Sequence, residues 1–122
     1  MSPAKCPVAI GIIAKNAAST IGACVDSLLP YVEQVVVSVD ETTTDETAKV
    51  AADHGAEVHL GLVVSEWHEC PHHGRVLAQH FAKARTANWE HLRKDLTWHG
   101  WVDSDDTLVG GDKLEAFLAQ TT

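Results

Sequence analysis

The sequence predicts an α/β fold: a Rossmann-like parallel sheet flanked by helices. Short apolar runs rich in β-branched residues alternate with segments whose apolar residues recur at helical spacing, and the connections are short. Such an alternation predicts right-handed crossovers that place helices on both faces of the sheet. The 122 residues are expected to form a single domain, residues 1–122.

The first expected strand and helix occupy residues 8–29. Residues 8–14 are a continuous apolar run, as in a strand that is buried on both faces. Apolar residues then recur at helical spacing over 21–29, with Ser19 as the expected N-cap and Pro30 beyond the helix.

A second strand and helix follow the same pattern. Residues 35–39 have the composition of a buried strand. The turn-forming residues after it lead into a helix at 46–54, with Asp45 as its cap and Gly55 at its end.

The second half is expected to continue the alternation. In chain order we expect a third strand, a loop, a third helix and a fourth strand, at residues 58–64, 66–74, 75–93 and 98–102. The third helix is inferred from apolar residues at helical spacing between Val76 and Ala84. Asp112 with Glu115 three residues later is the expected capping pair of a final helix.

Polar residues directly follow three of the expected strands. These groups are Lys15-Asn16, Asp40-Glu41 and the acidic run Asp103-Ser104-Asp105-Asp106. Because parallel strands end at the same edge of a sheet, we expect all three groups on one rim, where ligands bind in such folds.

The acidic run is the strongest local signal of chemistry. Its carboxylate oxygens suit Mg²⁺ or Mn²⁺, which take their remaining ligands from water and substrate phosphates. A solvated acidic turn is the alternative. The apolar strand before the run and the second acidic pair on the same rim favour the metal.

Asp40 and Arg85 each have two interpretations. At the end of the second strand, Asp40 either accepts hydrogen bonds from a ribose or a base, or complements the dipole of the next helix. Asp45 fills the dipole role better, which favours ligand binding for Asp40. Arg85 either pairs with the acidic run or offers its forked donors to a diphosphate, and the residues alone leave both alternatives open.

A histidine-rich segment at residues 67–73 contains residue types that bind zinc, and His59 and His80 are its expected neighbours. The spacing matches no zinc-site pattern. We therefore interpret these residues as surface histidines of a loop that covers substrate, and we expect no structural zinc.

Bulk composition argues against several classes. The net charge is −8 and the nine Lys and Arg residues are scattered, which does not suit a nucleic-acid backbone. Three widely spaced cysteines without a Cys-x-x-Cys motif indicate reduced thiols and a cytoplasmic protein. No apolar run reaches the roughly 18 residues that a membrane span needs, and we recognise no signal peptide.

Several segments, in chain order, resemble the N-terminal half of family 2 glycosyltransferases of the GT-A fold. The resemblance covers nearly the whole chain and includes the Asp-x-Asp (DxD) motif of the acidic run. Its segments are residues 8–16, Thr20-Ile21, Ser27-Leu28, 35–40, 45–47, Gly55-Ala56, 81–85 and 101–106.

The resemblance implies a site for a nucleotide-diphosphate sugar, typically a UDP-sugar, bound through Mn²⁺ or Mg²⁺. It assigns the nucleotide pocket to Ala14, Lys15, Asn16, Asp40, Glu41, Arg85, Asp103 and Ser104. Within that set Asp40 meets the base and Asp103 the ribose, while Asp105, with Asp103, holds the metal on the diphosphate. The implied activity is inverting sugar transfer of the hexosyltransferase type, to an acceptor that the sequence does not identify.

The chain departs from the family pattern in three respects. Thr42-Thr43 replace the common Gly-Ser, and Thr86 replaces the asparagine that follows the family's arginine, here Arg85. No counterpart of the acceptor-binding half, which carries the general base, follows the acidic run. We therefore assign no catalytic residue, and we expect a homo-oligomer or a partner to supply the missing half.

Two alternatives remain beside the transferase. One is a non-catalytic domain that only binds a nucleotide sugar. The other is a phosphatase, because residues 102–108 also resemble the haloacid-dehalogenase signature, whose first aspartate is a nucleophile. That family carries its signature on its first strand, whereas here it follows the fourth expected strand.

Overall fold

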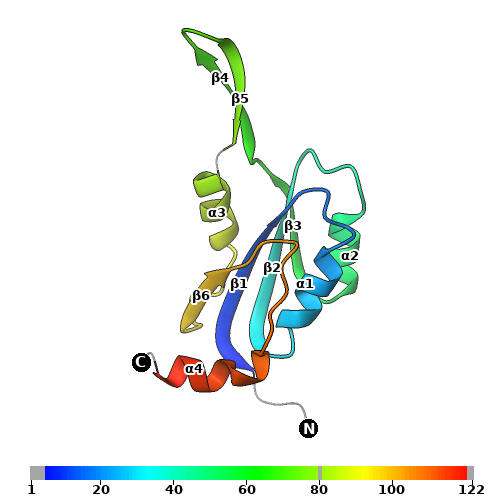
Figure 1. Cartoon of the computed structure of the whole chain (residues 1–122), viewed down its shortest axis with the longest axis vertical. Helices are drawn as coiled ribbons and strands as arrows, with labels where there is room; N and C mark the ends of the chain where they lie inside the picture. The colour runs from blue at the N-terminus through cyan, green and yellow to red at the C-terminus, as the bar shows by residue number, and fades with distance from the viewer. Residues whose placement is uncertain (1–4, 80, 121–122) are drawn as a thin grey trace.

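A four-stranded parallel sheet forms the centre of the molecule. The computed structural model describes residues 5–79 and 81–120. The strands lie in the order β3-β2-β1-β6 (Figure 1). They are β1 (Cys6–Ala14), β2 (Val32–Asp40), β3 (Glu57–Leu62) and β6 (Trp98–Trp101). The predicted α/β class with a Rossmann-like parallel sheet is confirmed.

Helices cover both faces of this sheet. α1 (Ile21–Leu28), α2 (Thr47–Asp53) and α4 (Leu114–Gln120) pack on one face, and α3 (Phe81–Trp89) packs on the other. Because side chains alternate along a strand, Ile12 and Val37 face α1 and α2, whereas Ala9 and Val36 face the α3 side. α4 lies at the amino ends of the strands, far from the rim (Figure 1).

The strand order reverses at β1. The chain runs outward from β1 through β2 to β3, and then crosses to the opposite side of β1 to form β6. In open α/β sheets this switch point, at the carboxyl ends of the strands, is where ligands bind. β6 ends level with Gly11 of β1, so the residues after Trp101 begin beside the last residues of β1.

Two of the expected helix caps are absent. The N-cap of α1 is Thr20, not Ser19, and its side chain caps no backbone N–H; its hydroxyl donates to the Ala17 carbonyl oxygen at 3.3 Å. Asp112 lies inside a short 3₁₀ helix, Gly111–Lys113, which begins after Gly110 in the left-handed conformation (φ 78°). A glycine therefore starts this last helical segment where we expected a capping pair.

The N-cap of α2 (Thr47–Asp53) is Glu46, one residue later than the expected Asp45, and the Glu46 side chain caps no backbone N–H. Asp45 Oδ1 accepts a hydrogen bond from the Thr47 backbone N–H at 3.0 Å, at the first residue of the helix. Gly55, with φ 100°, follows the end of the helix as expected.

The prediction of a loop at 66–74 and of a helix beginning at residue 75 is wrong. β4 (Ser65–Cys70) and β5 (Gly74–Gln79) pair antiparallel as a hairpin that projects beyond the carboxyl ends of the sheet strands (Figure 1). A helix there needs a core to cover its apolar side, but Leu77 is 55% exposed. α3 starts only at Phe81, and His80 lies outside the described residues.

Candidate functional site

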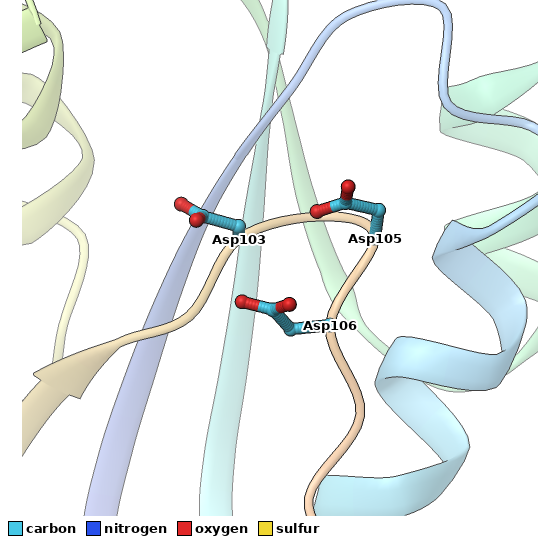
Figure 2. A group of neighbouring side chains, drawn as sticks. All are labelled: Asp103, Asp105 and Asp106. Atoms are coloured by element: carbon cyan, nitrogen blue, oxygen red, sulfur yellow. The ribbon is translucent and has the colours of Figure 1, made fainter.

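The acidic run lies in the loop that leaves β6 and passes toward α1 (Figure 2). Two hydrogen bonds attach this loop to α1. The Cys24 thiol donates to the Asp103 carbonyl oxygen at 3.5 Å, and the Leu108 N–H donates to Ser27 Oγ at 2.9 Å. The Asp106 N–H closes a turn by donating to the Asp103 carbonyl oxygen at 3.0 Å. The loop is therefore attached to α1 near both of its ends.

Three carboxylates converge in this loop. One side-chain oxygen from each of Asp103, Asp105 and Asp106 lies within 4.8 Å of the other two, and all three residues are exposed. Such a group offers three hard oxygen ligands and leaves positions for water and phosphate, as Mg²⁺ and Mn²⁺ require. The donor set could hold the predicted cation, and it contains Asp106 besides Asp103 and Asp105, the two candidates named from the sequence.

Arg85 reaches the acidic run from α3. Its Nη2 lies 3.4 Å from Asp103 Oδ1, and its guanidinium lies 5.0 Å from the ring centre of Trp101. Of the two interpretations of Arg85, the ion pair with the acidic run is present. An exposed pair of this kind is weak, so the guanidinium can turn to another anion at little cost.

The ends of β1 and β2 are tied together by side chains. Asn16, which adopts a left-handed conformation (φ 47°), accepts a hydrogen bond from the Thr44 N–H at 2.8 Å through Oδ1. Asp45 Oδ2 accepts one from the Ala18 N–H at 3.1 Å. The Asn16 side chain thus holds the rim together; that the backbone around Ala14 to Asn16 lines a nucleotide pocket stays a prediction.

The Asp40 carboxylate is buried at the end of β2, with an exposed fraction of 4%. Oδ1 accepts from the Thr42 N–H at 2.8 Å and from the Thr42 hydroxyl, and Oδ2 accepts from the Val64 N–H at 3.3 Å. Burial raises the pKa of Asp40, but these hydrogen bonds and the charge of Lys15 outweigh it and hold the pKa below its usual value. Asp40 therefore stays ionised and organises the β2 end of the rim.

Of the predicted nucleotide residues, Asp40 and Glu41 line a cleft at the ends of β2 and β3, and Ala14, Lys15 and Ser104 are not among its lining residues. The cleft measures about 270 Å³ and includes Asp40, Glu41, Thr43 and Gly61 in its wall. Glu41 and Lys15 are exposed, Ser104 is half-buried and Ala14 is buried. One strand, β1, separates this cleft from the acidic run, a distance of about 10 Å at normal strand spacing.

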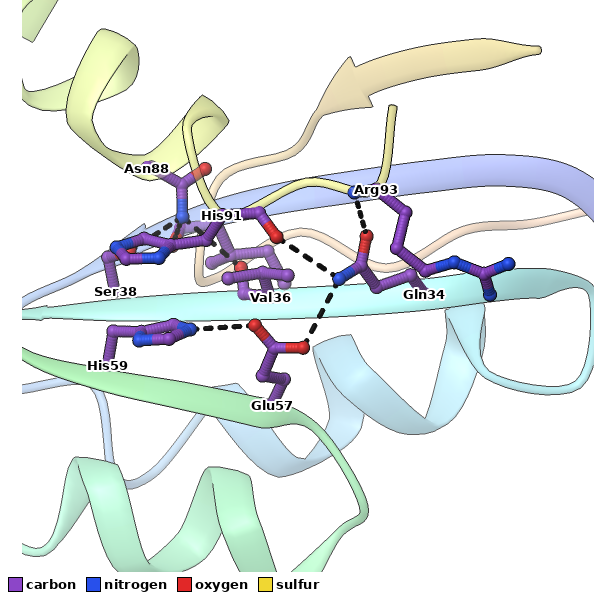
Figure 3. Close-up of polar contacts among 9 residues, drawn as sticks. Gln34, Val36, Ser38, Glu57, His59, Asn88, His91 and Arg93 are labelled. Atoms are coloured by element: carbon purple, nitrogen blue, oxygen red, sulfur yellow. Dashed lines mark hydrogen bonds and ion pairs between the residues drawn. The ribbon is translucent and has the colours of Figure 1, made fainter. Parts of the chain in front are cut away.

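A buried amide that the sequence analysis missed connects α3 to the sheet (Figure 3). Asn88 Nδ2 donates to Ser38 Oγ at 2.8 Å, to the Val36 carbonyl oxygen at 3.4 Å and to the Ile12 carbonyl oxygen at 3.3 Å. A Cβ at Gly11 would overlap Asn88 Oδ1. An isolated glycine inside an apolar strand signals the close approach of another group. Gly11 was therefore the signal in the sequence that could have indicated this contact.

A second polar network lies between β3 and the segment after α3 (Figure 3). His59 and His91 stack with ring centres 3.6 Å apart, and His59 Nε2 lies 2.7 Å from Glu57 Oε2. Gln34 Nε2 donates to Glu57 Oε1 at 3.2 Å. Burial raises the pKa of Glu57, but the hydrogen bonds from His59 and Gln34 and the neighbouring imidazoles outweigh burial. The pKa of Glu57 therefore lies below its usual value. His59 is therefore engaged far from the hairpin turn.

The histidine-rich segment, residues 67–73, forms the end of β4 and the turn that leads to β5. Cys70 Sγ lies 3.3 Å from His73 Nδ1, and the hairpin that carries both residues projects beyond the ends of the sheet strands (Figure 1). Among the described residues, the acidic run is the only group of three side chains whose ligand atoms converge. That the hairpin holds no structural zinc stays a prediction.

The three thiols are expected to differ sharply in reactivity. Burial, followed by the charges of Asp106, Asp105 and Asp103, raises the pKa of Cys24 to about 11, so at pH 8 only about one molecule in a thousand carries the reactive thiolate. Cys6 is also buried and its pKa is raised, whereas Cys70 is partly exposed on the hairpin. Iodoacetamide should label Cys70 alone in the native protein.

Mass spectrometry of labelled peptides measures this difference. In denaturant all three cysteines should react, and Cys70→Ser should leave the native protein unlabelled. Labelling of native Cys24 at the rate of Cys70 would show that the acidic loop does not cover α1.

Fold and geometry together define a class: an α/β protein with a Rossmann-like sheet and a three-carboxylate group at its switch point. No model of a known protein family matches the chain, and no curated protein matches it either. Within residues 5–79 and 81–120, no helix has the length and apolar character needed to cross a membrane.

Proposed function

We propose that this chain is the donor-binding domain of a metal-dependent glycosyltransferase and that it binds a nucleotide-diphosphate sugar, typically a UDP-sugar, through Mn²⁺ or Mg²⁺. The observation that carries the proposal is the convergence of Asp103, Asp105 and Asp106 at the strand switch point. An acidic surface repels a diphosphate, and a bound cation reverses that repulsion.

The rim supports a division of roles. The three carboxylates face the diphosphate through the cation, and the cleft beside Asp40 and Glu41 takes the nucleoside. Although Asp40 accepts internal hydrogen bonds, Oδ2 has a single internal donor, Val64 N–H, and a carboxylate oxygen accepts more than one. Asp40 can therefore hold the cleft and still accept from a base N–H.

The reaction needs charge stabilisation at the leaving diphosphate. A divalent cation supplies this as a Lewis acid when it is bound. Arg85, which lies beside Asp103, can turn from that carboxylate to a phosphate oxygen and add a second positive charge. The phosphatase alternative has less support, because its signature belongs on a first strand and here follows β6 at the sheet edge.

Calorimetry with UDP, in the presence and absence of Mn²⁺, tests the proposal. Wild-type protein should bind UDP only with the cation. Asp105→Asn should weaken Mn²⁺ binding at least about tenfold, since even groups that only support metal ligands contribute that much. Asp112→Asn is the matched control, because Asp112 is an exposed aspartate on the 3₁₀ helix before α4.

Two outcomes would contradict the proposal. One is UDP binding that does not respond to the cation. The other is equal Mn²⁺ affinity in wild type and Asp105→Asn. Release of phosphate from a phosphomonoester, lost in Asp103→Asn, would instead support the phosphatase alternative.

A further inference from the structure

A second cleft lies on the α3 side of the acidic run. It measures about 250 Å³ and is lined by Arg85, Thr86, Trp89 and Trp101. The two indole rings lie 6.0 Å apart between centres and are tilted by 56°. Trp89 also contacts His99, at 6.2 Å between ring centres, so aromatic rings continue along the edge strand β6. The wall of this cleft is aromatic.

Trp101 keeps 54% of its surface exposed. Covering an indole with apolar surface normally stabilises a protein, and here the exposed part borders a cleft. The indole faces carry partial negative charge, which attracts C–H groups that carry partial positive charge. A ligand ring with an apolar face fits such a wall.

The charges at the cleft are already balanced. The Arg85 guanidinium lies 5.0 Å from the Trp101 ring centre and pairs with Asp103 at 3.4 Å. A neutral ligand can therefore occupy this cleft without leaving either of these two charges unpaired. Hydroxyl groups of such a ligand can accept hydrogen bonds from the remaining N–H donors of the Arg85 guanidinium, or they can bond to the Thr86 hydroxyl. The combination of an apolar face and a hydroxyl-rich edge is that of a neutral sugar ring.

The position of the cleft separates it from the nucleoside cleft. The cleft beside Asp40 lies at the ends of β2 and β3, whereas the aromatic cleft lies between β6 and α3, next to the loop after β6 that carries the acidic run. Arg85 joins the aromatic cleft to Asp103 directly. In a transferase the acceptor must reach the sugar beside the leaving diphosphate, so a sugar site next to the acidic run suits the proposed function.

We propose that the cleft of Trp89 and Trp101 binds a neutral sugar ring of the acceptor glycan. That the cleft binds a sugar is inferred from the cleft itself. That this sugar belongs to the acceptor rests on the proposed function. Trp101 supplies the stacking face, Trp89 the angled wall and Arg85 the polar edge.

The test uses four neutral probes: oligosaccharides of β-linked glucose, α-linked glucose and N-acetylglucosamine, and uridine as the nucleoside. Saturation-transfer NMR and tryptophan fluorescence titration measure binding to the whole chain. Wild type should bind at least one oligosaccharide, and Trp101→Ala should weaken it at least about tenfold, whereas Trp101→Phe, which keeps a ring, should stay within about threefold. Trp98→Phe is the matched control, because Trp98 lies on the same strand but packs against the core cluster on the opposite face of the sheet from α3.

UDP binding with Mn²⁺ separates the two proposals. Trp101→Ala should bind UDP and Mn²⁺ as wild type does. If wild type binds a glycan but does not bind UDP, this result contradicts the proposed function alone. The cleft proposal is overturned if no oligosaccharide binds wild type at millimolar concentration, or if Trp101→Ala loses uridine and not glycan. A change of molecular mass in Trp101→Ala by light scattering also overturns it, because the cleft would then be a contact between copies.

Discussion

Gly11→Ala is expected to destabilise the protein by about 3 kcal/mol, the upper end of the effect of overpacking a core. A Cβ at Gly11 would overlap Asn88 Oδ1, and Asn88 cannot move away without losing its hydrogen bonds to Ser38 and to two strand carbonyl groups. Since β1 is a central strand, it cannot yield easily either. Urea unfolding followed by circular dichroism measures the change.

Gly100→Ala is the matched control. Gly100 lies in β6, paired with Ile10 of β1, and a Cβ there would meet Ile10 Cδ1 at 3.5 Å, an ordinary contact. Its cost should therefore stay below about 1 kcal/mol.

A double-mutant cycle isolates the contact between Gly11 and Asn88. Asn88→Ala alone should cost about 2–3 kcal/mol, because buried polar partners lose their donor. Gly11→Ala combined with Asn88→Ala should cost clearly less than the sum of the two single changes, since the clash is removed. Strict additivity would show that the two residues do not touch.

Asp40→Asn is expected to destabilise the fold by about 1.5–3 kcal/mol near neutral pH, which is the range for hydrogen bonds to a charged group. An asparagine amide would turn an NH₂ group toward either the Thr42 donors or the Val64 N–H, and the buried site offers few other partners. Thermal or urea unfolding measures the loss. Asp53→Asn, which removes an exposed ion pair with Lys49, should cost less than about 1 kcal/mol.

The pH dependence of the same variant gives an independent check. The folded pKa of Asp40 lies below the ordinary value of 3.8, so its ionised form stabilises the fold above pH 3.8. That contribution is lost as the pH falls through the folded pKa. The stability difference between wild type and Asp40→Asn should therefore be largest above pH 3.8 and shrink in stronger acid. A difference that grows on acidification would contradict the buried carboxylate.

The alternation of apolar runs and helical periods was enough to predict the fold class. The polarity of a parallel sheet then placed Asp40 and the acidic run on one rim, because all strand ends of such a sheet share an edge. The convergence of Asp103 with Asp105 and Asp106 follows from local sequence, since the three residues share one short turn. These features depend on order along the chain and needed no tertiary contact.

The hairpin shows where local periodicity is insufficient. Val76 to Ala84 repeat at helical spacing, but a helical period stabilises a helix only if its apolar side meets a core. Leu77 meets none, so the backbone groups of β4 and β5 satisfy one another instead. Whether a core lies opposite a given segment is a property of the assembled sheet.

Tertiary structure also decided which polar side chains form hydrogen bonds and ion pairs within the fold. The sequence alone marked Asp40 as a ligand-binding residue and left Arg85 between two roles. The fold buries the Asp40 carboxylate under Thr42 and Val64, and it brings Arg85 from α3 to Asp103. Asn88 packs against Gly11 and donates to the carbonyl oxygen of Ile12, which is 76 positions away in the sequence. Gly11, isolated in an apolar strand, signals the close approach of some group, but only the packing of the whole chain decides that this group is Asn88.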